Sequence, residues 1–84
     1  MYQHTITIGN FGETLNVLHN EFGISFKKLG DELGYTDKYI MMVYYKKRPI
    51  TKQLIRSAND SLLFRFASDY KLYELVQNMD FQNK

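Results

Sequence analysis

The feature that most restricts the fold of this chain is a turn of only three residues, Gly34-Tyr35-Thr36, between two short helical patterns. Gly34 can adopt the left-handed backbone that ends a helix, and Thr36 can cap the start of the next one. Two helices joined by so short a turn cannot lie antiparallel and must cross steeply. We expect Gly30, in the first helix, to allow a close approach that a larger side chain would prevent.

An opening helix is predicted from Asn10 to Gly23. Asn10 and Glu13 have the spacing of a capping box, and Gly23 stops the apolar run. Residues 2–8 alternate weakly and are rich in β-branched side chains, so they predict either a short strand or an ordered arm. The residues of the opening helix that we expect to face inward are Leu15, Leu18 and Phe22, with Phe11 and Val17 beside them.

The next helices are short. Ser25 caps the helix before the turn, and the helix after the turn spans residues 37–45. The Lys46-Lys47-Arg48-Pro49 stretch interrupts the pattern, and a further helix begins at Thr51 or Lys52. The residues expected to face inward in these helices are Leu29, Leu33, Ile40, Val43, Leu54, Ile55 and Ala58.

The C-terminal part has an amphipathic helical pattern. Residues 59–61 (Asn-Asp-Ser) form either a short turn with a new cap or a polar part of a longer helix. From Leu62 to about Met79 the apolar residues recur every three or four positions, which predicts a helix that contacts both the core and a second copy. They are Leu62, Leu63, Phe66, Ala67, Tyr70, Tyr73, Val76 and Met79. The possible dimer contacts are Leu63, Phe64 and Leu75.

A chain of 84 residues is expected to form one domain. We divide it into an N-terminal arm at residues 1–9, a helical core at 10–58, and a C-terminal helix and tail at 59–84. The absence of cysteine excludes disulfides and thiolate chemistry. The sequence shows neither a signal-peptide pattern nor an apolar run long enough to cross a bilayer, so the expected location is the cytoplasm.

The charge is unevenly divided along the chain. Residues 27–56 hold eight lysines and arginines against three acids, a net charge of +5, while the remainder holds three against six, a net charge of −3. A basic middle between acidic ends is typical of a protein that docks on a polyanion with one face, although a solvated lysine face is an alternative.

Catalytic and metal-binding motifs are absent from the sequence. His4 and His19 have no carboxylate or cysteine partners at ligand spacing, so we expect no metal and no cofactor. No nucleophile elbow or phosphate-binding glycine loop occurs. The protein is therefore not expected to be an enzyme.

The stretch from Ile24 to Thr36, followed by Ile40, Val43 and Lys46-Lys47-Arg48-Pro49-Ile50-Thr51, resembles the Cro and phage-repressor (XRE-type) helix-turn-helix family. The resemblance covers roughly residues 11–58. It implies an all-α, lambda-repressor-like bundle of four to five helices. It further implies a sequence-specific DNA-binding protein, a Cro-like transcriptional regulator of a phage or mobile element in a bacterium, which binds double-stranded DNA as a homodimer.

The resemblance also assigns site residues. The base-facing positions are Asp37, Lys38, Tyr39, Met41 and Met42. The residues expected to contact phosphates are Lys27, Lys28, Lys46, Lys47, Arg48 and Lys52. Lysines at the start of a helix oppose its dipole, which fits an anion docked there.

Three departures from the family pattern leave an alternative open. Phe26 stands where the family often has a phosphate-binding glutamine, and Lys46 stands where a glycine usually closes the recognition helix. The outward side of that helix carries apolar and aromatic residues in place of the usual base-reading polar set. They are Tyr39, Met41, Met42, Tyr44 and Tyr45. Such a surface also suits protein binding, so the alternative is a repurposed helix-turn-helix that binds and inhibits a host protein.

Overall fold

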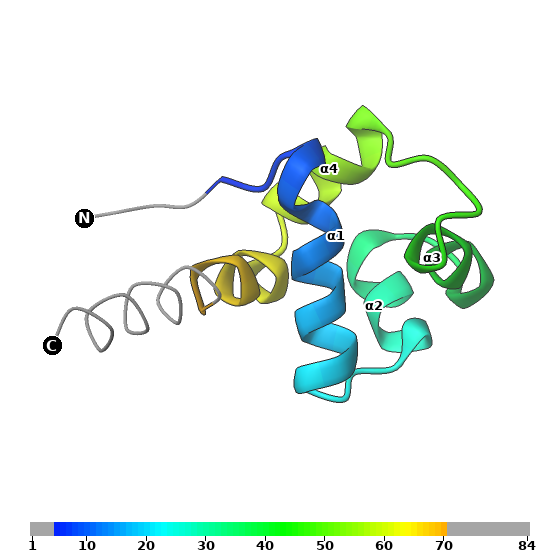
Figure 1. Cartoon of the computed structure of the whole chain (residues 1–84), viewed down its shortest axis with the longest axis horizontal. Helices are drawn as coiled ribbons and strands as arrows, with labels where there is room; N and C mark the ends of the chain where they lie inside the picture. The colour runs from blue at the N-terminus through cyan, green and yellow to red at the C-terminus, as the bar shows by residue number, and fades with distance from the viewer. Residues whose placement is uncertain (1–4, 71–84) are drawn as a thin grey trace, which may run out of the picture.

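The computed structural model describes residues 5–70, in which every regular element is helical and no strand occurs (Figure 1). The elements are α1 (Ile8–Asn16), the π-helical turn η1 (Val17–Glu21), α2 (Phe26–Leu33), α3 (Asp37–Tyr44) and α4 (Lys52–Asn59). A last helical segment covers residues 62–70, and the remainder of the predicted C-terminal helix lies outside the described residues. The all-helical class predicted from the sequence is confirmed.

Helix α1 begins earlier than its sequence pattern predicts. The backbone N–H of Asn10 donates to the hydroxyl of Thr7 at 3.3 Å, and the N–H of Thr7 donates to the amide oxygen of Asn10 at 2.8 Å. This reciprocal pair is a capping box with Thr7 as its cap, so the predicted box of Asn10 and Glu13 is wrong. Residues 5–7 form no strand, and the N-terminal arm ends at residue 7 because a threonine with asparagine three positions later already satisfies the free N–H groups.

The π-helical turn changes which residues face inward. Helix α1 runs directly into η1, where the N–H of Phe22 donates to the carbonyl of Val17, five residues earlier. The extra residue in this turn shifts the helical phase, so Val17 and Leu18 are both buried while Phe22 is exposed. The inward orientation predicted for Phe22 is therefore wrong. Gly23 ends the helix with a φ of 68°, as predicted.

The turn between α2 and α3 depends on two glycines. Gly34 has a φ of 84°, and the carbonyl of Gly30 accepts both the N–H of Gly34 at 2.7 Å and that of Tyr35 at 2.8 Å. A Cβ atom at Gly30 would lie 2.5 Å from the carbonyl oxygen of Tyr35 and 3.1 Å from backbone atoms of Thr36. The predicted close approach at Gly30 is confirmed, and its partner is the backbone of the turn. Among the elements from α1 to α4, α2 and α3 consequently make the most extensive contact with each other.

The caps predicted at Ser25 and Thr36 are confirmed, and Thr51 caps the helix predicted to begin at Thr51 or Lys52. Each of the three accepts a backbone N–H from the third residue of its helix, in α2, α3 and α4 respectively. The buried apolar residues of the helices form one core, while Ile55 is only half-buried. The buried apolar residues are Ile6, Phe11, Leu15, Val17, Leu18, Leu29, Leu33, Ile40, Val43, Leu54, Ala58, Phe64 and Ala67.

The last helical segment starts at a turn capped by Ser61, the first of the two alternatives for residues 59–61. The hydroxyl of Ser61 accepts the N–H of Phe64 at 3.2 Å and donates to the carboxylate of Glu32 at 2.8 Å. The inward position predicted for Ala67 is confirmed, and Leu63 and Tyr70 pack against the core, but two other predicted residues face outward. Leu62 is 82% exposed and Phe66 is 59% exposed, so neither is a core residue.

Phe64 is fully buried and stacks on Phe11, with ring centroids 5.8 Å apart. The expectation that Phe64 contacts a second copy is therefore wrong. Apolar residues occur on more than one face of this helix, and the fit of the Phe64 ring against α1 selects the face that is buried. Of the other two proposed dimer contacts, Leu63 is half-buried and Leu75 lies outside the described residues.

The segment before α1 is attached to α4 through Asn59. The N–H of Ile6 donates to the side-chain oxygen of Asn59 at 3.0 Å, and the side-chain nitrogen of Asn59 donates to the carbonyl of Ile6 at 2.9 Å. The Ile6 side chain is buried in the core. Two residues that lie 53 positions apart in the sequence are thus held together by one side-chain amide. Over residues 5–70, no helix combines the length and the hydropathy needed to cross a membrane.

We expect Gly30→Ala to lower the free energy of unfolding by about 2–3 kcal/mol, because the new methyl group overlaps the turn backbone. The matched control is Gly12→Ala in α1, where a Cβ atom meets nothing within 4 Å. This control should raise the free energy of unfolding by about 0.5–1 kcal/mol, the usual gain from alanine in a helix. Urea denaturation measures both, and equal effects would contradict the role given to Gly30.

Candidate nucleic-acid interface

Helix α3 is anchored on one side only. Thr36 caps its start, and Ile40 and Val43 fix it to the core. In Figure 1, α3 lies at the edge of the molecule, on the opposite side of α1 from the segment at residues 62–70. The side of α3 that faces away from Ile40 and Val43 is therefore open along its length.

The predicted base-facing residues divide into two groups. Asp37, Lys38 and Met41 are exposed on the outer side of α3, whereas Tyr39 and Met42 are half-buried on its flanks. The Tyr39 ring stacks on that of Tyr35, with centroids 4.8 Å apart and an angle of 18° between the planes. The outer side thus carries an acid, a lysine and a methionine.

The predicted phosphate-binding residues are all exposed. The ring of Phe26, the first residue of α2, contacts that of Tyr45, just after α3, at 6.3 Å. This contact brings the start of α2 to the end of α3. Two groups of cations therefore flank this contact on one part of the surface, which we call the corner. They are Lys27 with Lys28 and the run at residues 46–48. Lys52 lies at the far end of the α3–α4 loop, as the first residue of α4.

One of these cations is partly compensated. The ammonium group of Lys27 lies 3.9 Å from the carboxylate of Asp31, one turn further along α2, and both side chains are largely exposed. Exposed pairs of this kind contribute little and are screened by salt, so Lys27 remains accessible to an anion. No other ion pair occurs among residues 5–70.

An aromatic cluster, which we define as His19, Phe26, Tyr44 and Tyr45, holds this corner together. The rings of His19 and Phe26 stack with centroids 4.0 Å apart, and Tyr44 meets each of them edge-on at 5.2 Å. Tyr45 packs against Tyr44 at 5.0 Å. The Nδ1 atom of His19 lies 2.8 Å from the carbonyl oxygen of Ile24, to which it donates as Nδ1–H. Phe26 therefore joins η1 to the end of α3.

The Tyr44 hydroxyl extends this contact toward α1. It accepts a hydrogen bond from the side chain of Asn20 at 2.6 Å and lies 3.4 Å from the amide oxygen of Asn16. Asn16 and Asn20 are also hydrogen-bonded to each other. Sequence patterns do not reveal this network, because its members lie 24 to 28 positions apart.

Lys46 has the left-handed backbone that the sequence pattern associates with glycine. Its φ is 62°, and it is the one described residue other than glycine with a positive φ. The N–H of Lys46 donates to the carbonyl of Val43, and that of Lys47 donates to the carbonyl of Met42. This arrangement closes the end of α3 as a glycine would, at an energetic cost for a side chain with a Cβ atom.

In the part of the chain that the structure describes, no group of three or more histidine, cysteine, aspartate or glutamate residues could hold a metal ion. His19 has its ring packed in the aromatic cluster, and His4 lies outside the described residues. The sequence and the structure match no protein-family model, no curated protein and no solved structure.

We expect Lys46→Gly to raise the free energy of unfolding by about 1 kcal/mol, because glycine adopts the left-handed backbone without strain. Lys47→Gly is the matched control, since Lys47 has no positive φ and gains nothing from glycine. It should leave stability unchanged or lower it. Thermal and urea denaturation measure both variants, and a gain of similar size at Lys47 would refute the strain assigned to Lys46.

Proposed function

We propose that this protein is a helix-turn-helix DNA-binding protein, a Cro-like transcriptional regulator of a phage or mobile element. In this proposal α2 and α3, with the turn at Gly34, form the helix-turn-helix. Helix α3 enters the major groove, and α2 lies across the phosphate backbone. The tight turn at Gly30 and Gly34 supports this proposal, because helices joined by a short glycine-containing turn are expected to cross steeply.

The observation that carries the proposal is the open outer side of α3 beside a corner of exposed cations. Helix α3 buries Ile40 and Val43 and packs Tyr39 and Tyr44 at its flanks, which leaves the side with Asp37, Lys38 and Met41 free to enter a groove. The contact of Phe26 with Tyr45 gathers the lysines of α2 and the residues after α3 within reach of one backbone. Phosphate contacts from such cations supply most of the affinity and fix the orientation of the protein.

Sequence readout would rest on few polar groups. Lys38 is the side chain of α3 best suited to donate to a base edge, such as the acceptors of guanine. Met41 and Tyr45 are 38% and 58% exposed, and both can make apolar contacts with thymine methyl groups. We therefore expect a preference for a site that combines a guanine with neighbouring thymines.

The proposal includes a twofold dimer on a pseudo-palindromic site. Two exposed side chains of the last helical segment, Leu62 and Phe66, offer an apolar surface for a second copy. Phe22 and Tyr70 extend it, with their rings 5.2 Å apart. In such a dimer the two α3 helices would lie about 34 Å apart, one turn of the DNA helix.

We expect Lys47→Ala and Arg48→Ala each to weaken binding to all DNA sequences. Each should reduce the slope of log K against log salt by up to about 0.9, the value for one lost phosphate contact. The matched control is Arg65→Ala, on the helical segment at the other side of α1 (Figure 1), which should leave the slope unchanged. Fluorescence anisotropy at several salt concentrations measures the slopes. An unchanged slope in the Lys47 and Arg48 variants would refute the phosphate assignment.

A second candidate, binding to and inhibiting a host protein, is favoured by the exposed Met41 on the outer side of α3 and the exposed Tyr45 just after it. Met41 and Tyr45 are its exposed members, whereas Met42 and Tyr44 are half-buried and contribute less surface than their sequence positions predicted. Replacing Met41 and Tyr45 by lysine separates the two candidates. The double variant should retain or strengthen overall attachment to DNA while it abolishes an apolar protein contact. If DNA attachment were lost in the folded variant at low salt, the placement of α3 against DNA would be wrong.

A further inference from the structure

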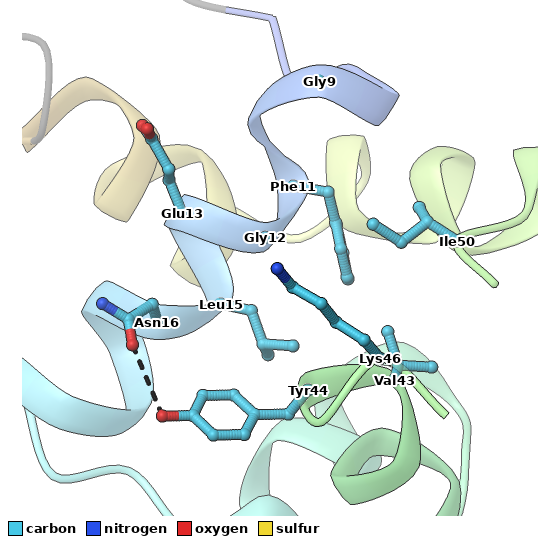
Figure 2. A pocket seen from close by; sticks show the side chains of 10 residues that line it. All are labelled: Gly9, Phe11, Gly12, Glu13, Leu15, Asn16, Val43, Tyr44, Lys46 and Ile50. Atoms are coloured by element: carbon cyan, nitrogen blue, oxygen red, sulfur yellow. Dashed lines mark hydrogen bonds between the residues drawn. The ribbon is translucent and has the colours of Figure 1, made fainter. Parts of the chain in front are cut away.

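A groove lies between α1 and the end of α3 with the loop that follows it (Figure 2). Its volume is about 540 Å³, which lies in the range of small-molecule sites. The floor is apolar and consists of the core side chains Phe11, Leu15 and Val43, with the half-buried Ile50 beside them. At one end, the amide of Asn16 and the hydroxyl of Tyr44 supply polar atoms.

Two glycines keep the groove open along α1. Gly9 and Gly12 are one helical turn apart and both line it. A Cβ atom at Gly12 would meet no heavy atom within 4 Å, and one at Gly9 would only reach the Thr7 hydroxyl at 3.7 Å. Packing therefore does not require glycine at either position, although glycine weakens a helix relative to alanine. Larger side chains at these positions would reduce the space above the floor.

Lys46 supplies a cation to the same groove. In Figure 2 its side chain extends across the groove toward α1, whereas the carboxylate of Glu13, on the rim, points away from it. No carboxylate lies within 4 Å of the Lys46 ammonium group among the described residues. Lys46 lies here although its positive φ strains a residue that has a Cβ atom. Local backbone strain of this kind is often found at functional sites.

We propose that this groove binds a small organic carboxylate with an apolar chain or ring. The carboxylate pairs with the ammonium group of Lys46, and the apolar part lies on the floor formed by Phe11, Leu15 and Val43. The unpaired cation beside apolar surface is the complement of an anion with a hydrophobic body. The groove shares Lys46 with the proposed phosphate contacts, but binding of the carboxylate requires no DNA and can be measured in its absence.

The test uses the full chain, labelled with ¹⁵N, and sodium hexanoate as the probe. We expect saturable shifts of the amide signals of Gly12, Asn16 and Lys46, with a dissociation constant on the order of 1 mM. Hexan-1-ol, which has the chain without the charge, and acetate, which has the charge without the chain, should each bind about tenfold more weakly. Hexylamine reverses the charge and should not bind.

Two variants locate the site. Gly12→Leu adds a side chain to the groove from α1 at a position where a Cβ atom meets nothing within 4 Å, and Lys46→Gly removes the cation while it relieves the backbone strain. Both should weaken hexanoate binding by about tenfold or more. Arg56→Ala, which removes an exposed cation of α4, is the control and should bind as the original chain does.

Because Lys46→Gly should be more stable than the original chain, lost binding in that variant cannot come from unfolding. Shifts that grow without saturation would overturn the proposal, as would equal affinity for hexan-1-ol, tighter binding of hexylamine, or unchanged binding by either groove variant.

Discussion

The carbonyl oxygen of Tyr35 occupies the place that a side chain at Gly30 would take. This contact fixes how closely the turn packs on α2 and therefore the direction in which α3 leaves it. Gly34 adds the left-handed backbone, and the carbonyl of Gly30 accepts the two N–H groups that follow α2. Because the direction of α3 relative to α2 is fixed in this way, Ile40 and Val43 reach the core and the opposite side of α3 remains exposed. The candidate site is thus a consequence of backbone packing at one residue.

Local chemistry explains which parts of the fold could be predicted from the sequence. The caps at Ser25 and Thr36 act within three residues of themselves, so their identity alone locates two helix starts. The start of α1 could not be chosen in the same way, because Thr7 and Asn10 are both good caps. The π-helical turn was not predictable either, since no residue type specifies it, and it moves Phe22 out of the core.

Contacts between distant elements explain the remaining differences. The burial of Phe64 depends on the surface that α1 presents, and an apolar helix with more than one possible face does not identify the buried one. At the candidate site, the positions of Lys38 and Met41 followed from the helical period. The link from Phe26 to Tyr45 joins residues 19 positions apart, and only the folded chain brings them together.

The two hydrogen bonds between the Asn59 side chain and the Ile6 backbone determine how much of the N-terminal region belongs to the folded unit. Shortening the chain past Ile6 would remove a core side chain and would also leave the amide of Asn59 without two of its partners. The damage would then exceed that expected for a loose tail. An extension fused ahead of Thr5 breaks neither bond. A fusion partner or affinity tag at this end is therefore better tolerated than a truncation that removes Ile6.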